Sequence, residues 1–149
     1  MGWWYGATPE WCLPLERDAR RRFGPLITWR YERDRLTYWI RELEIAGDTD
    51  LVTLEIRFYR KPLYPMWGQR PEDFPRVFAK PGERSKHRHI DDALCLWYPY
   101  DPPERRWTSD KGLLDLIEIS RRHLFMEAYW RDKKVWLLDD APHGLTKGG

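Results

Sequence analysis

One short stretch of the sequence brings together side chains that can catalyse reactions or bind metals. Residues 87–99 are HRHIDDALCLWYP, in which Cys95 lies in an apolar run just after two histidines and two aspartates. A cysteine in such a setting can be a buried apolar side chain, a metal ligand or a nucleophile. The neighbouring residue types favour some of these roles over others.

A metal site would combine His87, His89 and Cys95 with His143 from the last part of the sequence. Zinc sites bring such ligands together at short spacings, typically as a Cys-x-x-Cys pair or as two histidines on one helix face. The sequence contains neither spacing, and it also lacks the zinc signature of the nucleobase deaminases. We therefore expect no metal and no cofactor at this stretch.

A hydrolytic nucleophile needs a histidine base within hydrogen-bond distance of the thiol. The candidates for that base are His87, His89, His123 and His143. Asp91 and Asp92 disfavour this role, because nearby negative charge raises the pKa of a thiol and lowers its thiolate fraction. Hydrolysis is therefore an alternative and not the leading interpretation.

Acyl carriage agrees best with the residues around Cys95. A thioester-carrying cysteine exchanges one thioester for another and then yields to an amine, so it needs exposure more than strong ionisation. Asp91 and Asp92 can orient that amine and help to remove its proton. The local chemistry therefore favours a cysteine that carries an acyl group.

Strand alternation predicts where the thiol points. If residues 93–97 are extended, Leu94 and Leu96 face the interior, whereas Cys95 and Trp97 face a surface groove. The alternative is a buried structural cysteine, since free cysteine is among the most buried residue types. The pattern leaves both positions open.

The elements that must position this stretch begin with a helix and a meander of strands. Residues 14–24, PLERDARRRFG, predict a short helix that begins at Pro14, has Leu15, Ala19 and Phe23 on one face, and ends at the glycine. Alternating apolar residues then predict antiparallel strands. The strands are expected at 26–32, 36–43, 51–59 and, more weakly, 76–79.

Loops and a long helix complete the predicted fold. Four prolines make 60–75 a loop, and 80–106 is long and irregular, although its apolar part must pack on the domain. Residues 108–130 predict a long helix capped by Thr108 or Ser109. Its apolar positions are Leu113, Leu114, Leu116, Ile117, Ser120, Leu124, Phe125, Ala128 and Tyr129. The order of elements predicts an α+β fold, a sheet with helices packed on it.

Composition and net charge limit which classes of partner the protein is expected to bind and which cellular compartment it is expected to occupy. The net charge of +2 is nearly balanced, whereas nucleic-acid-binding domains usually have a larger basic excess, so no nucleic-acid partner is expected. No apolar run approaches the ~18 residues of a membrane span, and the first residues lack a signal-peptide pattern. With two cysteines, and no Cys12–Cys95 disulfide expected, we predict a cytoplasmic protein with a single domain over 1–149.

Several of these features, in this order, resemble the ubiquitin-conjugating fold. The resemblance is to the bacterial conjugating-enzyme-like proteins of type II CBASS anti-phage operons. Those proteins have a histidine several residues before LCLYYP, a downstream tryptophan, a helix ending in L-x-x-Y-x-x-W and a closing Pro-His. The corresponding parts here are HRHIDDALCLWYP, Trp107, HLFMEAYW and WLLDDAPH, over roughly residues 85–144.

The resemblance implies a function for the chain. Cys95 would be the thioester cysteine, and the partner would be a cGAS-like nucleotidyltransferase whose C-terminal carboxylate is joined to an amine of a target protein or small molecule. The chain has no Gly-rich nucleotide loop and no room for an adenylating domain, as in family members that stand alone. The alternative from a different class is an inactive adaptor that only binds the nucleotidyltransferase.

Two positions depart from the family pattern. Eukaryotic members have an asparagine eight residues before the cysteine, and His87 occupies that position here. His87 would then either donate a hydrogen bond to the tetrahedral oxyanion or only brace the loop. The bacterial pattern prefers Asp-Gly where this chain has Asp91 and Asp92, so the turn must form without the freedom of glycine.

The aromatic residues after the cysteine predict a surface for the partner tail. Trp97, Tyr98 and Tyr100 precede a proline-rich turn, and Trp107 is assigned to the same surface. Rigid aromatics can grip an extended peptide, although they can equally pack the loop against the core. His143 would close over the site and move protons, the alternative being a turn histidine that follows a proline.

Overall fold

Alternating apolar residues in the first half of the chain produce a four-stranded sheet. The computed structural model describes residues 4–137 and 146–147. The strands are β1 (Ile27–Tyr31), β2 (Arg35–Leu43), β3 (Val52–Tyr59) and β4 (Arg76–Phe78), which pair antiparallel in that order. The predicted meander is confirmed, and each strand begins and ends within one residue of its predicted bounds.

β3 shows most clearly why the sheet forms. Val52, Leu54, Ile56 and Phe58 alternate along the strand, and all four are buried. They face a common core with the apolar side chains of β2, since Leu54 pairs with Ile40 across the two strands. One face of the sheet is therefore apolar, and the helices pack against it.

The first helix, α1 (Pro9–Phe23), begins five residues earlier than predicted. Thr8 is its N-cap and Pro9 occupies its first turn, where proline is well tolerated. Pro14 therefore lies inside the helix and not at its start. The predicted end is confirmed, because Gly24 adopts φ +52°, a conformation that glycine reaches without strain.

The second helix, α2 (Leu113–Lys133), begins later than predicted. Gly112, with φ +87°, is its N-cap, so neither Thr108 nor Ser109 caps it. The preceding residues form a separate 3-10 turn, and the indole of Trp107 donates a hydrogen bond to the Gly112 carbonyl oxygen. The glycine thus separates the 3-10 turn from the α-helix.

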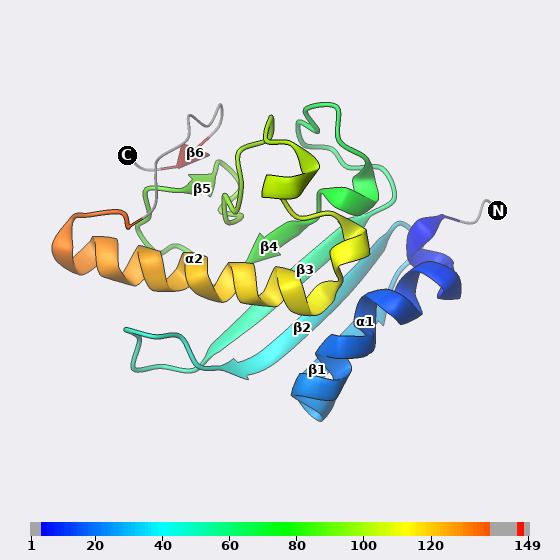
Figure 1. Cartoon of the computed structure of the whole chain (residues 1–149), viewed down its shortest axis with the longest axis horizontal. Helices are drawn as coiled ribbons and strands as arrows, with labels where there is room; N and C mark the ends of the chain where they lie inside the picture. The colour runs from blue at the N-terminus through cyan, green and yellow to red at the C-terminus, as the bar shows by residue number, and fades with distance from the viewer. Residues whose placement is uncertain (1–3, 138–145, 148–149) are drawn as a thin grey trace.

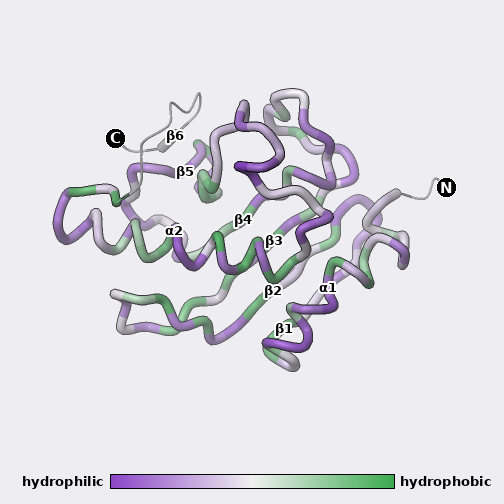
Figure 2. Tube along the Cα trace, in the orientation of Figure 1, coloured by the Kyte–Doolittle hydropathy of each residue, from purple (hydrophilic) through white to green (hydrophobic). Residues whose placement is uncertain are grey.

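The two helices lie on one side of the sheet, with α2 running across the strands and α1 nearer to β1 (Figure 1). The chain is α+β, as predicted. Hydrophobic and hydrophilic residues alternate along α2 and the strands, as expected for elements with one buried face (Figure 2). The most completely buried apolar side chains are Tyr38, Ile40, Leu54, Ile56, Phe58, Trp107, Leu113, Leu116 and Ile117.

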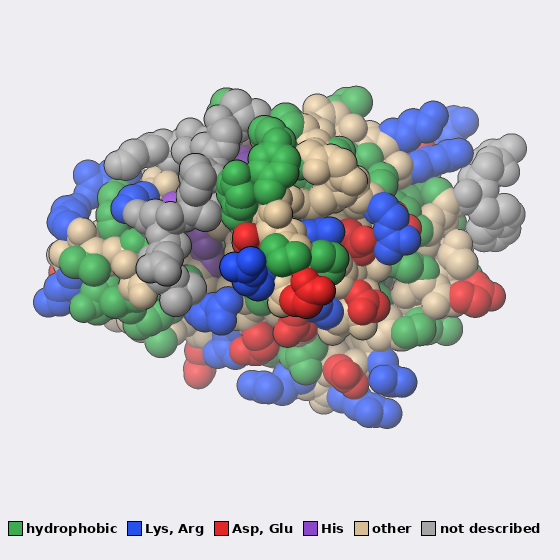
Figure 3. Space-filling view, turned by 45° about the horizontal axis from the view of Figure 1, so that its top comes forward, with side chains coloured by type: hydrophobic (Ala, Val, Ile, Leu, Met, Phe, Trp, Pro, Cys, Tyr) green, Lys and Arg blue, Asp and Glu red, His purple; other side chains and the backbone are tan. Residues whose placement is uncertain are grey.

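Short elements occupy the connecting segments. Two-residue strands β5 (Arg88–His89) and β6 (Thr146–Lys147) pair antiparallel. The 3-10 helices are Tyr5–Ala7, Gly24–Leu26, Pro71–Asp73, Pro103–Arg105 and Ser109–Lys111. Among the described residues, no helix is both long enough and apolar enough to cross a membrane. Basic and acidic side chains are interspersed over the face drawn in Figure 3.

Candidate functional site

The stretch around Cys95 folds into a tight hairpin, which we call the cysteine hairpin (residues 87–95). The amide of His89 donates to the carbonyl of Ala93 at 2.7 Å, and the amide of Cys95 donates to the carbonyl of His87 at 3.0 Å. The amide of Leu94 donates to the carbonyl of Val77 in β4 at 2.8 Å. The backbone on both sides of the thiol is therefore fixed to the sheet.

The two aspartates make the turn of this hairpin without glycine. Asp92 adopts φ +75°, a left-handed conformation that aspartate tolerates better than most residues. Its carboxylate accepts a hydrogen bond from the Gly82 amide at 2.8 Å, and the Asp91 carboxylate accepts one from the Ala93 amide at 3.1 Å. The expectation that Asp91 and Asp92 form the turn is confirmed, and their side chains stabilise it.

Cys95 is buried, with 4% of its surface exposed, so the prediction that its thiol faces a surface groove is wrong. Alternation fails here because Leu94 and Cys95, which would face opposite sides of an extended segment, are both buried. The amide of Leu94 is also bonded to β4.

The environment of the thiol opposes its ionisation. The pKa of Cys95 is raised to about 12, chiefly by burial; the guanidinium of Arg76 opposes this rise, and the charges of Asp91 and Glu127 add to it. The thiol is therefore protonated near neutral pH. Cys12, the other free cysteine, is less deeply buried, and burial followed by the charge of Glu16 raises its pKa to about 11.

Both histidines of the hairpin are buried. His87 packs its ring against Trp136, with ring centroids 4.5 Å apart, and its amide donates to the Ser85 hydroxyl at 3.1 Å. His89 packs edge-on against Phe74, with centroids 6.5 Å apart. The fold brings His87, His89 and Cys95 into one hairpin, whereas their roles in catalysis stay predictions. His143 lies outside the described residues.

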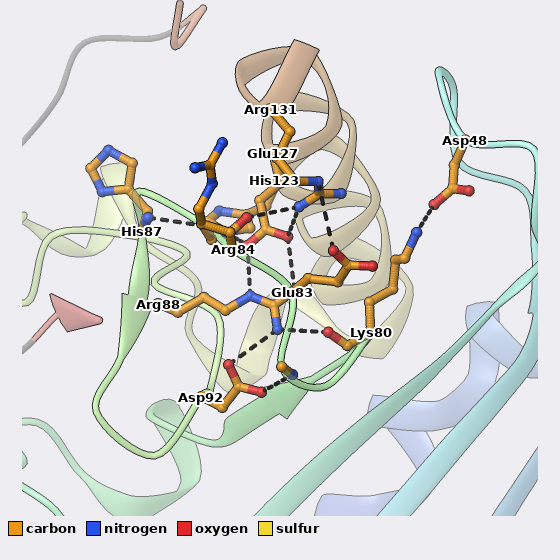
Figure 4. A network of polar contacts seen from close by, with 12 residues as sticks. Asp48, Lys80, Glu83, Arg84, His87, Arg88, Asp92, His123, Glu127 and Arg131 are labelled. Carbon is orange, nitrogen blue, oxygen red and sulfur yellow. Dashed lines mark hydrogen bonds and ion pairs between the residues drawn. The ribbon is translucent and has the colours of Figure 1, made fainter. Parts of the chain in front are cut away.

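A buried ionic cluster joins the hairpin to α2 (Figure 4). The guanidinium of Arg88 donates two hydrogen bonds to the Glu127 carboxylate, both at 2.8 Å, and neither side chain is exposed to solvent. Arg88 also donates to the Lys80 carbonyl at 2.9 Å and to Asp92 at 3.3 Å. The Nε2 of His123 lies 3.3 Å from Oε2 of Glu127, the oxygen that also accepts from the Nε of Arg88.

Of this cluster, Arg88 and Glu127 were not identified from the sequence. Although burial by itself raises the pKa of Glu127, the hydrogen bonds from Arg88 and the contact with His123 lower it to about 2. Glu127 follows Ser120 by two helical turns, on the buried face of α2. A charged residue at such a position is the signal that indicates a buried ion pair.

The aromatic residues assigned to the partner tail separate into two groups. Trp97 is half-buried against Phe74, and Tyr98 packs against Tyr100, which is 63% exposed. Trp107 has no exposed surface, because it belongs to the hydrophobic core that the sheet and α2 share. Trp107 therefore cannot contact a bound tail in this structure, whereas tail binding by the first three stays a prediction.

A groove of about 990 Å³ opens beside the hairpin turn. His89 and Asp91 line it, together with Arg76 at the start of β4. The Nε of Arg76 donates to the Asp91 carboxylate at 3.0 Å, and the charge of Arg76 acts to lower the pKa of Cys95. Arg76 was not identified from the sequence because no local pattern distinguishes it.

In the described ranges, 4–137 and 146–147, no three His, Cys, Asp or Glu side chains are arranged to hold a metal ion. The chain matches no protein-family model, no curated protein and no solved structure. Its chemistry must therefore be inferred from its own residues. The arrangement provides a fixed but protonated thiol, two buried histidines beside it, and a carboxylate at the hairpin turn.

Proposed function

We propose that the chain is a protein-conjugating acyltransferase that resembles the ubiquitin-conjugating enzymes. In this proposal Cys95 carries the C-terminal acyl group of a cGAS-like nucleotidyltransferase as a thioester and passes it to an amine, in bacterial anti-phage defence. The observation that supports it most is the cysteine hairpin, which fixes the backbone around Cys95 between β4 and α2. A helix, an antiparallel meander and a long helix surround the hairpin in the order expected for that family.

The reaction has two balanced steps. Because a thiol does not condense with a free carboxylate, the acyl group must arrive activated, for example as a thioester. The Cys95 sulfur attacks the acyl carbon, and the donor thiol leaves with a proton. An amine then attacks the Cys95 thioester, an amide bond forms, the carbon–sulfur bond breaks, and the sulfur regains a proton.

The neighbours of Cys95 suit the second step. Asp91 lies at the hairpin turn, has a side chain that is 43% exposed, and can accept a proton from an attacking amine. His87 faces Cys95 across the hairpin through a backbone hydrogen bond and can stabilise the oxyanion.

A second candidate is an adaptor without chemistry, which only binds the nucleotidyltransferase. One observation favours it: the thiol is 4% exposed and its pKa is about 12. An acyl donor can reach Cys95 only if the segments that cover it move apart. The two candidates therefore differ in whether an activated acyl group becomes attached to Cys95.

A loading experiment separates these candidates. The chain is mixed with a benzyl thioester of a peptide that has the partner's C-terminal sequence, and the product is analysed by intact mass with and without dithiothreitol. We expect one adduct that dithiothreitol removes, that Cys95→Ala abolishes and that Cys12→Ala retains. An adduct that persists in Cys95→Ala but disappears in Cys12→Ala would contradict the assignment, and no adduct at all would support the adaptor.

Transfer from the loaded protein tests His87. If His87 stabilises the oxyanion, His87→Ala should slow single-turnover transfer to a lysine amine by roughly 10²–10³, whereas His87→Asn should recover much of the rate. If His87 only braces the hairpin, His87→Ala should lower the melting temperature and weaken loading and transfer together. A stable His87→Ala variant with a normal rate would eliminate the catalytic role.

A further inference from the structure

The groove beside the hairpin turn has a basic lining. It lies between the β1–β2 turn, the segment that follows β3 and residues 89–91. Its charged residues are Arg33, Arg60, Lys61 and Arg76, together with the acids Asp34 and Asp91. The cations outnumber the carboxylates, although the chain as a whole is nearly neutral. The groove is therefore a local basic surface.

Arg76 is a rigid and nearly buried cation in the wall of this groove. It is 5% exposed, its Nε is bonded to Asp91, and its guanidinium lies 3.9 Å from the centre of the Tyr64 ring. Tyr64 is itself fixed, because its hydroxyl donates to the Phe74 carbonyl at 2.6 Å. Among the described residues, the two terminal nitrogens of Arg76 have no hydrogen-bond acceptor.

Donors that a guanidinium leaves unpaired at a groove can bind an anion. The terminal nitrogens of Arg76 are not among the buried polar atoms that lack a partner, so they are accessible to solvent or to a ligand in the groove. Two terminal nitrogens in a fixed plane match the two oxygens of a carboxylate. Arg60 is held only loosely, since its closest carboxylate, that of Asp34, is 3.8 Å away. Arg60 can therefore turn toward a bound anion.

We propose that this groove binds an extended segment of a partner protein in which carboxylates are mixed with apolar side chains. Arg76 anchors one carboxylate, and Arg60 and Lys61 attract the others. Leu63 is fully exposed and Ile90 is 67% exposed at the same groove, so they provide contacts for the apolar side chains. The binding needs no acyl chemistry and applies equally to an acyltransferase and to an adaptor.

The same observations disfavour a nucleic acid. A phosphate backbone would bring its continuous negative charge close to the carboxylates of Asp34 and Asp91. Arg76 already covers one face of the Tyr64 ring, so that face cannot stack on a base. Peptide carboxylates are spaced by side chains and can avoid the acids of the groove.

Equilibrium binding tests the proposal in the Cys95→Ala chain, which makes the result independent of thioester chemistry. The probes are a fluorescein-labelled peptide Glu-Leu-Asp-Glu-Val-Asp, its amide counterpart Gln-Leu-Asn-Gln-Val-Asn, and a labelled hexauridylate. We expect the acidic peptide to bind at least about tenfold more tightly than the amide peptide, and less tightly as salt is added. Amide NMR shifts should change at Lys61 and Ile90 and not along α1.

Variants locate the binding. Arg76→Lys keeps the charge but loses the planar fork, and we expect affinity to fall about tenfold. The double variant Arg60→Gln with Lys61→Gln alters more exposed residues, so it can still be measured if Arg76→Lys does not fold. It should weaken binding about threefold or more. Arg17→Gln with Arg21→Gln removes the same charge from the exposed side of α1, and should change affinity less than about twofold.

Three outcomes would overturn the proposal. The first is equal affinity for the acidic and amide peptides. The second is wild-type affinity in the variant with Arg60→Gln and Lys61→Gln. The third is binding of hexauridylate, but not of the acidic peptide, that depends on Arg60 and Lys61.

Discussion

The two aspartates of the cysteine hairpin are paired with different arginines, and the two arginines differ in how many of their nitrogens donate hydrogen bonds. Asp92 is paired with Arg88, whose three nitrogens donate to two carboxylates and one carbonyl. Asp91 is paired with Arg76, which donates to it from a single nitrogen. Both arginines are nearly or fully buried, yet, of the two, Arg76 alone has nitrogens without a hydrogen-bond acceptor among the described residues.

The difference separates a structural ion pair from a binding residue. A buried arginine whose three nitrogens all donate hydrogen bonds stabilises the arrangement of the elements it joins, here the hairpin and α2. An arginine whose terminal nitrogens are unpaired at a groove can bind an anion. The charges of Arg76, Asp91 and Glu127 all shift the pKa of Cys95.

Removing the buried ion pair between Arg88 and Glu127 should have the largest effect on stability. Glu127→Leu leaves the buried guanidinium of Arg88 without its main partner, and we expect a loss of about 3–5 kcal/mol in the free energy of unfolding. Arg88→Met combined with Glu127→Leu removes both charges and should be much less harmful. Urea denaturation measures both variants, and equal losses in the two would show that packing, and not the unpaired charge, causes the effect.

Acid should weaken the same cluster. The pKa of Glu127 is about 2 in the folded chain, against an ordinary value of 4.5. The folded state thus binds its proton less readily, so Glu127 contributes stability above pH 4.5, and this contribution is lost as the pH falls through 2. The stability difference between wild type and Glu127→Gln should shrink by about 3 kcal/mol across that range.

Urea titrations at a series of pH values follow this difference. Glu118→Gln is a suitable control, since the Glu118 side chain is 44% exposed and, among the described residues, forms an ion pair only with Arg121. Its stability relative to wild type should change little over the same range. A wild-type to Glu127→Gln difference that is independent of pH would show that Glu127 has the same pKa in the folded and unfolded chains.

The Cys95 thiol should react slowly. The pKa of Cys95 is about 12 and that of Cys12 about 11, and Cys95 is also the more buried. Near neutral pH, iodoacetamide should modify Cys12 about tenfold faster than Cys95, because it reacts with the thiolate. Peptide mass mapping of Cys12→Ser and Cys95→Ser gives the two rates, and faster modification of Cys95 would mean that its cover opens readily.

The smallest effect on stability should come from removing the ion pair between Asp91 and Arg76. Asp91→Asn removes a partly exposed ion pair with Arg76 and should cost less than about 1 kcal/mol. Asp92→Asn is the matched control, since asparagine also tolerates the left-handed conformation, and it should cost more because Asp92 is paired with buried Arg88. Thermal unfolding ranks the stabilities of the two variants. A larger loss in Asp91→Asn than in Asp92→Asn would contradict the proposed difference between the Arg76 and Arg88 ion pairs.

Local patterns in the sequence determined the elements of this protein. The alternation of Val52, Leu54, Ile56 and Phe58 predicted β3, and the glycine at 24 predicted the end of α1, because each depends only on neighbours along the chain. The turn at Asp91 and Asp92 was instead expected from the resemblance to the family pattern, which has Asp-Gly at this place. The start of α2 was missed, since Gly112 interrupts a pattern that is otherwise helical.

Only the tertiary structure decided what surrounds Cys95. Arg88 and Glu127 are 39 positions apart, and no periodicity links one to the other. Whether a side chain of an extended segment faces solvent depends on what packs over it, and at Cys95 both faces are covered. The position of Arg76 likewise depends on residues distant in the sequence, because Tyr64 and Asp91 hold its guanidinium at the groove and leave its terminal nitrogens unpaired. Burial and pairing of charges are properties of contacts between segments, which the order of residues alone does not specify.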